Sequence, residues 1–117
     1  MPHPIEEKAT KILIDYLESK GHKVEKSDRK TFDLIINGKY AEIKGKYKCF
    51  KDLDFISLSD RQYQEALKND FDIYLVCDLE NTPEIHKISS RKLLKQRTRR
   101  ITSYEFDKSA IKNCLEK

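Results

Sequence analysis

The chain of 117 residues has few of the residues that interrupt regular secondary structure, with 3 glycines and 3 prolines, and it has no tryptophan. Charged residues make up 38% of the sequence, a share that also occurs in disordered proteins. The scarcity of glycine and proline and the regular spacing of the apolar residues argue against disorder. We therefore expect one folded domain over residues 1–117, with a small core and a heavily solvated surface.

Long apolar runs are also missing, since none approaches the ~18 residues that a membrane-spanning helix needs. Residues 1–7 lack the basic and then apolar order of a secretory signal. The cysteines, Cys49, Cys77 and Cys114, are odd in number, widely spaced and without a CxxC pair. They are therefore expected to be reduced thiols rather than disulfides or metal ligands, and the protein is expected to be cytoplasmic.

Motifs of several enzyme classes are absent. With 3 glycines the chain has no glycine-rich phosphate loop, and it carries no serine or cysteine nucleophile motif. The histidines lack metal-ligand spacing and are expected at the surface: His3, His22 and His86.

Positive charge is concentrated in one segment. Lysine and arginine outnumber aspartate and glutamate by 24 to 20, for a net charge of +4. Residues 91–100 contain no acid and six basic residues: Arg91, Lys92, Lys95, Arg97, Arg99 and Arg100. Such a block is typical of a surface that binds nucleic acid, although a solubilising strip has the same composition.

Apolar residues recur every three or four positions between Ile5 and Lys20, which predicts a helix with one apolar face. Pro4 suits the start of this helix and Gly21 its end. A short edge strand is expected over residues 22–26.

Residues 31–46 predict a β-hairpin. Two strand-like runs flank Asn37-Gly38, and this dipeptide favours a two-residue turn because both turn residues must adopt positive φ.

The remaining pattern predicts a loop over residues 47–54, a helix over 59–69 capped by Ser59, and a strand over 72–79 that is buried on both faces. A strand over 84–88 and a closing helix over 107–115 follow. The expected order α-β-β-β-α-β-β-α gives an α/β fold, a mixed β-sheet flanked by helices.

A two-residue turn at Asn37-Gly38 places Asp33 directly opposite Glu42, with Lys44 on the same face. The other face is apolar and should be the core side, carrying Phe32, Leu34, Ile36, Ala41 and Ile43. Two opposed carboxylates repel each other unless they are neutralised. A divalent cation, compensation by Lys44 or a different register could each resolve this repulsion, and a solvated hairpin face is the simplest alternative.

Asp33, followed nine residues later by Glu42-Ile43-Lys44, resembles the D…(D/E)xK signature of the restriction-endonuclease-like phosphodiesterases, the PD-(D/E)XK superfamily. Residues 5–79 follow the element order of that family's core, α-β-β-β-α-β. The segments around them look most like the small Mrr or Holliday-resolvase-like branch. One departure is Phe32, where the family often has proline.

The resemblance implies a Mg²⁺- or Mn²⁺-dependent endonuclease that cleaves phosphodiesters by attack of an activated water. It implies that Asp33, Glu42 and the Ile43 carbonyl bind the metal and that Lys44 is the catalytic lysine. Some members add a glutamate from the first helix, for which Glu6 is preferred over its neighbour Glu7. Members also use a polar residue of the second helix, for which Gln62 is preferred over Gln64.

Both additions have simple structural alternatives, a glutamate in a first helical turn and a surface glutamine.

The expected partner is nucleic acid, with DNA favoured over RNA, bound through basic residues that follow the site: Lys46, Lys48, Lys51, Arg91, Arg97, Arg99 and Arg100. Gly45 would allow close approach of a phosphate backbone or form a strand-end bulge. A second copy or a specificity partner is expected, because the domain is small. The alternatives are an inactive nucleic-acid-binding or assembly module and a protein-interaction component of a toxin or antiphage system.

Overall fold

A computed structural model describes residues 4–96, 99–100 and 104–116. It contains a five-stranded mixed sheet of order β1-β2-β3-β5-β6 and a three-stranded sheet of order β4-β8-β7. The predicted α/β class with a mixed sheet flanked by helices is confirmed. None of the helices in the described part of the chain has the length and apolar character that a bilayer crossing requires.

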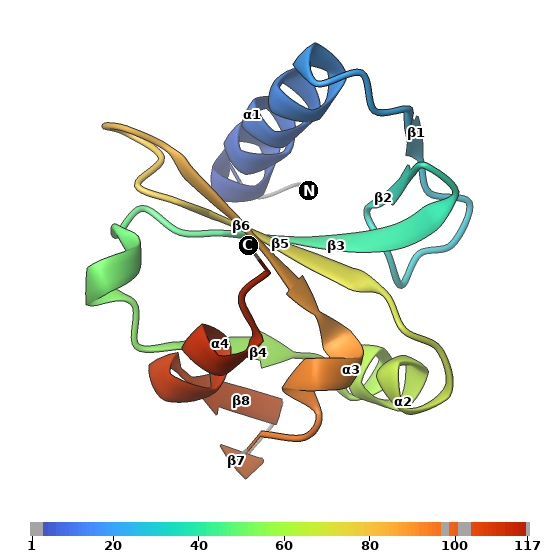
Figure 1. Cartoon of the computed structure of the whole chain (residues 1–117), viewed down its shortest axis with the longest axis vertical. Coiled ribbons are helices and arrows are strands. Elements are labelled where there is room, and N and C mark those ends of the chain that lie inside the picture. The colour runs from blue at the N-terminus through green and yellow to red at the C-terminus, as the bar shows by residue number, and fades with distance from the viewer. Residues whose placement is uncertain (1–3, 97–98, 101–103, 117) are drawn as a thin grey trace.

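The elements follow the chain in the order shown in Figure 1. The helices are α1 (Pro4–Ser19), α2 (Asp60–Lys68), α3 (Ser90–Leu93) and α4 (Lys108–Cys114), with a 3-10 turn at Phe50–Asp52. The strands are β1 (Val24–Lys26), β2 (Leu34–Ile36), β3 (Lys39–Gly45), β4 (Phe55–Leu58), β5 (Asp72–Cys77), β6 (Glu84–Ser89), β7 (Arg99–Arg100) and β8 (Tyr104–Asp107).

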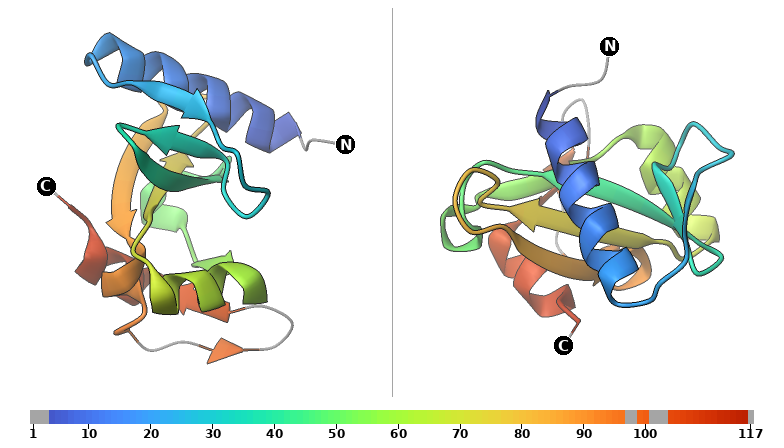
Figure 2. Two further views of the ribbon diagram at one scale, coloured as in Figure 1. Left: turned by 90° about the vertical axis from the view of Figure 1, so that its right-hand side faces the viewer. Right: turned by 90° about the horizontal axis from the view of Figure 1, so that it is seen from above.

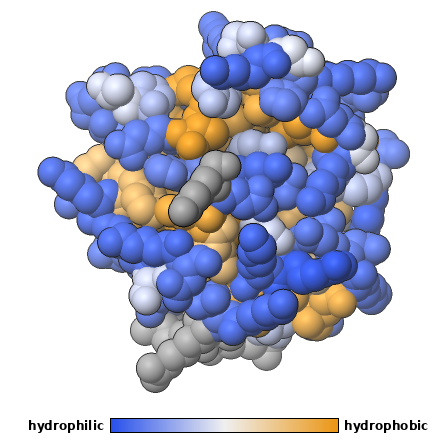
Figure 3. Space-filling view, in the orientation of Figure 1, coloured by the Kyte–Doolittle hydropathy of each residue, from blue (hydrophilic) through white to orange (hydrophobic). Residues whose placement is uncertain are grey.

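The five-stranded sheet separates two apolar cores. Helix α1 covers one face, while α2, α4 and the small sheet lie on the other (Figures 1 and 2). Strand β3 pairs parallel with β5, and the other strand pairs are antiparallel. All six residues of β5 are buried, as its continuous apolar run predicts. The surface seen in Figure 3 is mainly hydrophilic, with separate apolar patches.

Strand β3 is unusually close to α1 at Gly45. A Cβ atom built on Gly45 would lie 2.7 Å from the Cβ of Ala9 and 3.2 Å from the carbonyl oxygen of Ile5. Gly45 therefore allows the helix to pack against the strand. Gly45 was expected to allow a phosphate backbone to approach. In the structure it is helix α1 that approaches it.

The small sheet is the main feature that the sequence pattern did not predict. Strand β4 lies between the expected loop over residues 47–54 and the expected helix over 59–69, where no strand was predicted. It pairs with β8, about fifty residues further along the chain. Four residues of alternating character cannot indicate so distant a partner. Phe32 does not lie on the apolar face of the hairpin as expected. It precedes β2 and packs in the opposite core against Tyr40 and Phe71.

We predict that Gly45→Ala destabilises the protein by about 1–3 kcal/mol, because the added methyl group overlaps Ala9. Urea unfolding of both proteins measures the change. In the double variant Ala9→Gly/Gly45→Ala the overlap is relieved, so its loss should be smaller than the sum of the two single losses. Equal stability of Gly45→Ala and the wild type would contradict this close packing.

Candidate active site

The hairpin turn sets the position of the first acidic residue. Asn37 and Gly38 have φ values of 51° and 83°, as a tight two-residue turn requires. The register pairs Leu34 with Ala41, and the N–H of Asp33, which precedes β2, donates a hydrogen bond of 3.1 Å to the carbonyl of the same Ala41. Asp33 is close enough to Glu42 for the two side chains to interact. The carboxylate of Asp33 accepts a hydrogen bond of 2.8 Å from the backbone N–H of Ile43, which fixes it beside β3.

Glu42 lies on the opposite face of β3 from α1 and is only 7% exposed. Its Oε2 is 3.2 Å from the ammonium of Lys44. The same oxygen accepts a hydrogen bond from the side-chain amide of Gln62. A buried carboxylate requires such partners, because burial without them costs several kcal/mol.

Gln62 connects this site to the start of α2. The backbone N–H of Gln62 donates a hydrogen bond to the Ser59 hydroxyl oxygen. In return, the backbone N–H of Ser59 donates a hydrogen bond of 3.2 Å to Oε1 of Gln62, which completes a capping box. Its Oε1 also lies 3.4 Å from the Lys44 ammonium, and its Nε2 donates to the carbonyl of Thr31. Gln64 is exposed, so the structure brings the preferred glutamine to the site.

The prediction that Tyr63, Ala66 and Leu67 form the buried side of α2 is only partly confirmed. Ala66 is buried and Tyr63 is half-buried, but Leu67 is 59% exposed. The buried position next to the sheet is taken by Gln62, because the helix turns this side chain toward Glu42 and Lys44.

Burial raises the pKa of Glu42 to about 8. A hydrogen bond with Asp33 and the negative charge of that residue add to the rise, while Lys44 and the Gln62 amide oppose it. The repulsion that the sequence predicts between the two acids is therefore present. Burial therefore favours the protonated form of Glu42 to a higher pH than in an exposed glutamate.

A cavity of about 440 Å³ opens beside Asp33 and is bordered by α1. Both Glu6 and Glu7 line it, so the structure does not separate these two candidate ligands. The sequence analysis missed the other residues of α1 that line it, which are Thr10, Lys11, Ile14 and Asp15. Thr10 and Lys11 lie one helical turn after Glu6 and Glu7, and Ile14 and Asp15 lie two turns after them, so helical periodicity could have identified all four.

The donor set fits a hard divalent cation. Asp33 and Glu42 offer carboxylate oxygens close enough to interact, and Ile43, whose carbonyl is the third expected ligand, directly follows Glu42 in the sequence. No group of three or more His, Cys, Asp or Glu residues in the described ranges could hold a metal by itself. A metal here would rely on two carboxylates, a carbonyl and water, which is the oxygen-rich set that Mg²⁺ and Mn²⁺ accept.

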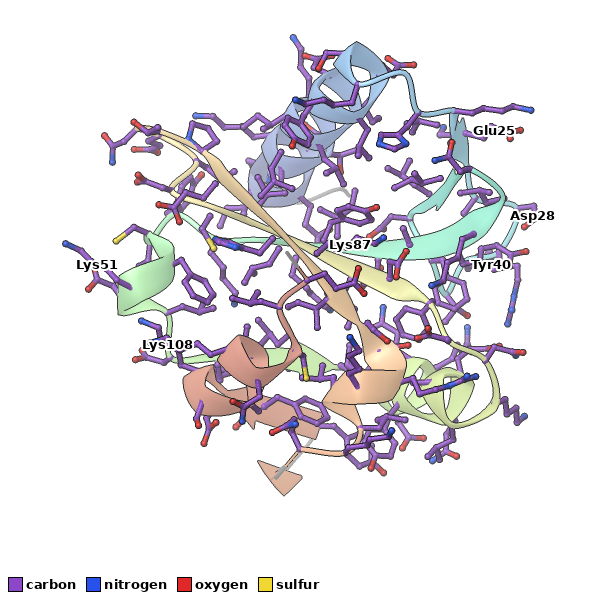
Figure 4. The ribbon with its side chains drawn as sticks, in the orientation of Figure 1. Glu25, Asp28, Tyr40, Lys51, Lys87 and Lys108 are labelled. Carbon is purple, nitrogen blue, oxygen red and sulfur yellow. The ribbon has the colours of Figure 1, made fainter. Side chains whose placement is uncertain are left out.

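The lysines after β3 do not form one patch. Lys46 is half-buried near Lys44, whereas Lys48 is exposed and lies 3.8 Å from Asp54. Lys51 is on the 3-10 turn, where its carbonyl accepts a hydrogen bond from Lys108. In Figure 4, Lys51 and Lys108 lie on the opposite side of the view from Tyr40, which is two residues before Glu42.

The basic block is only partly described. Arg91 is exposed, and its backbone N–H donates to Asp70 at the start of α3. Arg99 and Arg100 form β7, beside β8. Arg97 lies outside the described residues, so the expected nucleic-acid contacts of this block stay a prediction.

The family described as Protein NO VEIN, C-terminal, matches residues 5–88, which is well over half of the chain. The chain belongs to this family. The part of the NO VEIN C-terminal domain that matches runs from α1 to β6 and includes Asp33, Glu42, Lys44 and Gln62. No curated protein and no solved structure matches the chain.

We predict that Glu42→Gln makes this NO VEIN C-terminal domain more stable than the wild type at pH 8 and above. Folding raises the pKa of Glu42 from 4.5 to about 8, so the folded state binds the extra proton between these values. The wild type should therefore lose stability by about 1 kcal/mol per pH unit as pH rises through this window. Denaturant unfolding in EDTA at pH 5, 6.5 and 8 measures the slope.

Glu25→Gln is the matched control for this series, because Glu25 is an exposed glutamate on the edge strand β1. This control should retain the wild-type slope. Parallel pH profiles for the wild type and Glu42→Gln would show that burial does not shift the titration of Glu42.

Proposed function

We propose that the chain is a metal-dependent nuclease that hydrolyses phosphodiester bonds of nucleic acid, with DNA preferred over RNA. The observation that carries the proposal is the pairing of Asp33 with Glu42 beside the Lys44 ammonium, 3.2 Å from the Glu42 oxygen. This arrangement supports the resemblance to the D…(D/E)xK signature. The finer relationship to the PD-(D/E)XK superfamily and its Mrr-like branch is part of the proposal.

Asp33, Glu42 and the Ile43 carbonyl would hold Mg²⁺ or Mn²⁺, with Glu6 or Glu7 facing the same cavity as Asp33. The bound ion would lower the pKa of a water and stabilise negative charge on the phosphate oxygens. The N–H of Ile43 holds the Asp33 carboxylate in place, so this ligand is oriented before the ion arrives.

Lys44 would place its positive charge next to the phosphate under attack. Its side chain is 21% exposed, which leaves the ammonium accessible from solvent while Glu42 and Gln62 restrain it. Gln62 acts as a positioning residue, because its amide contacts both Glu42 and Lys44. We propose a Mg²⁺-dependent endonuclease whose second copy or specificity partner completes substrate recognition.

One observation favours a second candidate function. Glu42 is buried and has a raised pKa, so without a metal its protonated form, which is a poor metal ligand, is favoured. A domain that never releases this proton would still bind nucleic acid without cleaving it. The alternative is therefore an inactive nucleic-acid-binding or assembly module of the same fold.

We expect the wild type to cleave plasmid DNA with Mg²⁺ or Mn²⁺ and not with EDTA. Lys44→Ala and Glu42→Gln should each lose at least about a hundredfold in rate, because each removes charge from the reacting centre. Gel analysis of supercoiled, nicked and linear DNA measures the rates. Lys23→Ala, a change at an exposed lysine before β1, should keep the wild-type rate. Cleavage by both site variants at the wild-type rate rules out this active site.

Metal binding can be tested without activity. We expect Mg²⁺ or Mn²⁺ to raise the thermal midpoint of the wild type, since a ligand at a hundred times its Kd stabilises the folded state by about 2.7 kcal/mol. Asp33→Asn should abolish this rise, because it removes one of two carboxylate ligands. Differential scanning fluorimetry with and without the ion measures the shift. A rise of the same size in Asp33→Asn would place the metal elsewhere.

A further inference from the structure

Lys46 continues the face of β3 that carries the candidate site. Alternate residues of a strand share one face, so Glu42, Lys44 and Lys46 follow one another on the same side of the sheet. The pairing with β5 extends to this position, because the Lys46 N–H donates a hydrogen bond of 2.9 Å to the Val76 carbonyl. Lys46 is therefore held in line with Lys44 and is not part of a mobile loop.

The surroundings of the Lys46 ammonium differ from those of its neighbours. The Lys44 ammonium lies 3.2 Å from a carboxyl oxygen of Glu42, and the Lys48 ammonium lies 3.8 Å from one of Asp54. Within the part of the chain that the structure describes, no carboxylate forms an ion pair with Lys46. Its ammonium instead lies 5.7 Å from the ring centroid of Phe55, which holds it over the surface of β4.

Burial lowers the pKa of Lys46, and the positive charge of Lys44 lowers it further. The ammonium groups of Lys44 and Lys46 thus lie on one face of the strand, close enough to repel each other. Glu42, which precedes both along the strand, contacts the Lys44 ammonium. Such an arrangement is costly in the free protein. An anion that reaches both groups would remove this cost.

We propose that Lys46 binds a backbone phosphate of the nucleic-acid substrate, next to the phosphate that faces Lys44. The cation–π contact with Phe55 restrains the ammonium at this position. The proposal rests on the proposed function, and it assigns the expected phosphate contact to Lys46 ahead of Lys48 and Lys51. Those two lysines are exposed, and the Lys48 ammonium has Asp54 as a partner.

The test measures binding of a fluorescein-labelled DNA oligonucleotide to the full chain in EDTA by anisotropy at several salt concentrations. Lys46→Met should weaken binding about tenfold and reduce the slope of log K against log salt by about 0.7–0.9, the value for one phosphate contact. Lys46→Arg should bind within about threefold of the wild type. Lys48→Met should lose less than Lys46→Met, and the control Lys23→Met should match the wild type.

Each outcome decides the proposal. Equal losses in Lys46→Met and Lys48→Met, no loss in Lys46→Met, or a wild type that binds no oligonucleotide would overturn it. Thermal unfolding checks that Lys46→Met is folded, and Lys46→Gln replaces it if it is not. A cleavage assay on the same proteins separates the two claims: loss of binding in Lys46→Met with no cleavage by the wild type supports the Lys46 contact and rejects the nuclease. Cleavage by the wild type together with unchanged binding in Lys46→Met supports the nuclease and rejects the Lys46 contact.

Discussion

The burial of Glu42 across the hairpin from Asp33 is the interaction on which the candidate site depends. A carboxylate that is 7% exposed needs compensation, and the chain supplies it from two elements: Lys44 on the same strand and Gln62 on α2. The compensation is incomplete, since burial still raises the pKa of Glu42 to about 8. Added positive charge is therefore favoured at Glu42 on β3. A proton can supply it, and in the proposed enzyme a divalent cation would.

The fold supports this point from both sides of the sheet. Gly45 lets α1 pack closely enough for its first turns to border the cavity at Asp33. On the other side, the capping box that starts α2 uses the same glutamine that contacts Glu42 and Lys44. The start of α2 and the arrangement of the site are thus coupled, because one side chain satisfies both.

The sequence predicts most of the site because its determinants are local. Asn37-Gly38 defines the turn and the register, and alternation then places Lys44 beside Glu42. The small sheet could not be predicted, because β4 and β8 meet only through the rest of the fold. Burial of Gln62 in place of Leu67 also depends on tertiary packing, since a polar side chain is buried only where partners exist for it. The choice between Glu6 and Glu7 stays open for a related reason, because both turn toward one cavity.

In the proposed nuclease, the charges on this face of β3 would link metal binding to substrate binding. Lys44 and Lys46 place two ammonium groups on this face, and burial favours the protonated form of Glu42. A divalent cation that displaces the proton would add two positive charges and restore one negative charge, so the site would become more positive than before. This additional positive charge would attract the negatively charged phosphates of a nucleic-acid strand. In this arrangement the metal would strengthen substrate binding, and by linkage the substrate would strengthen metal binding to the same degree.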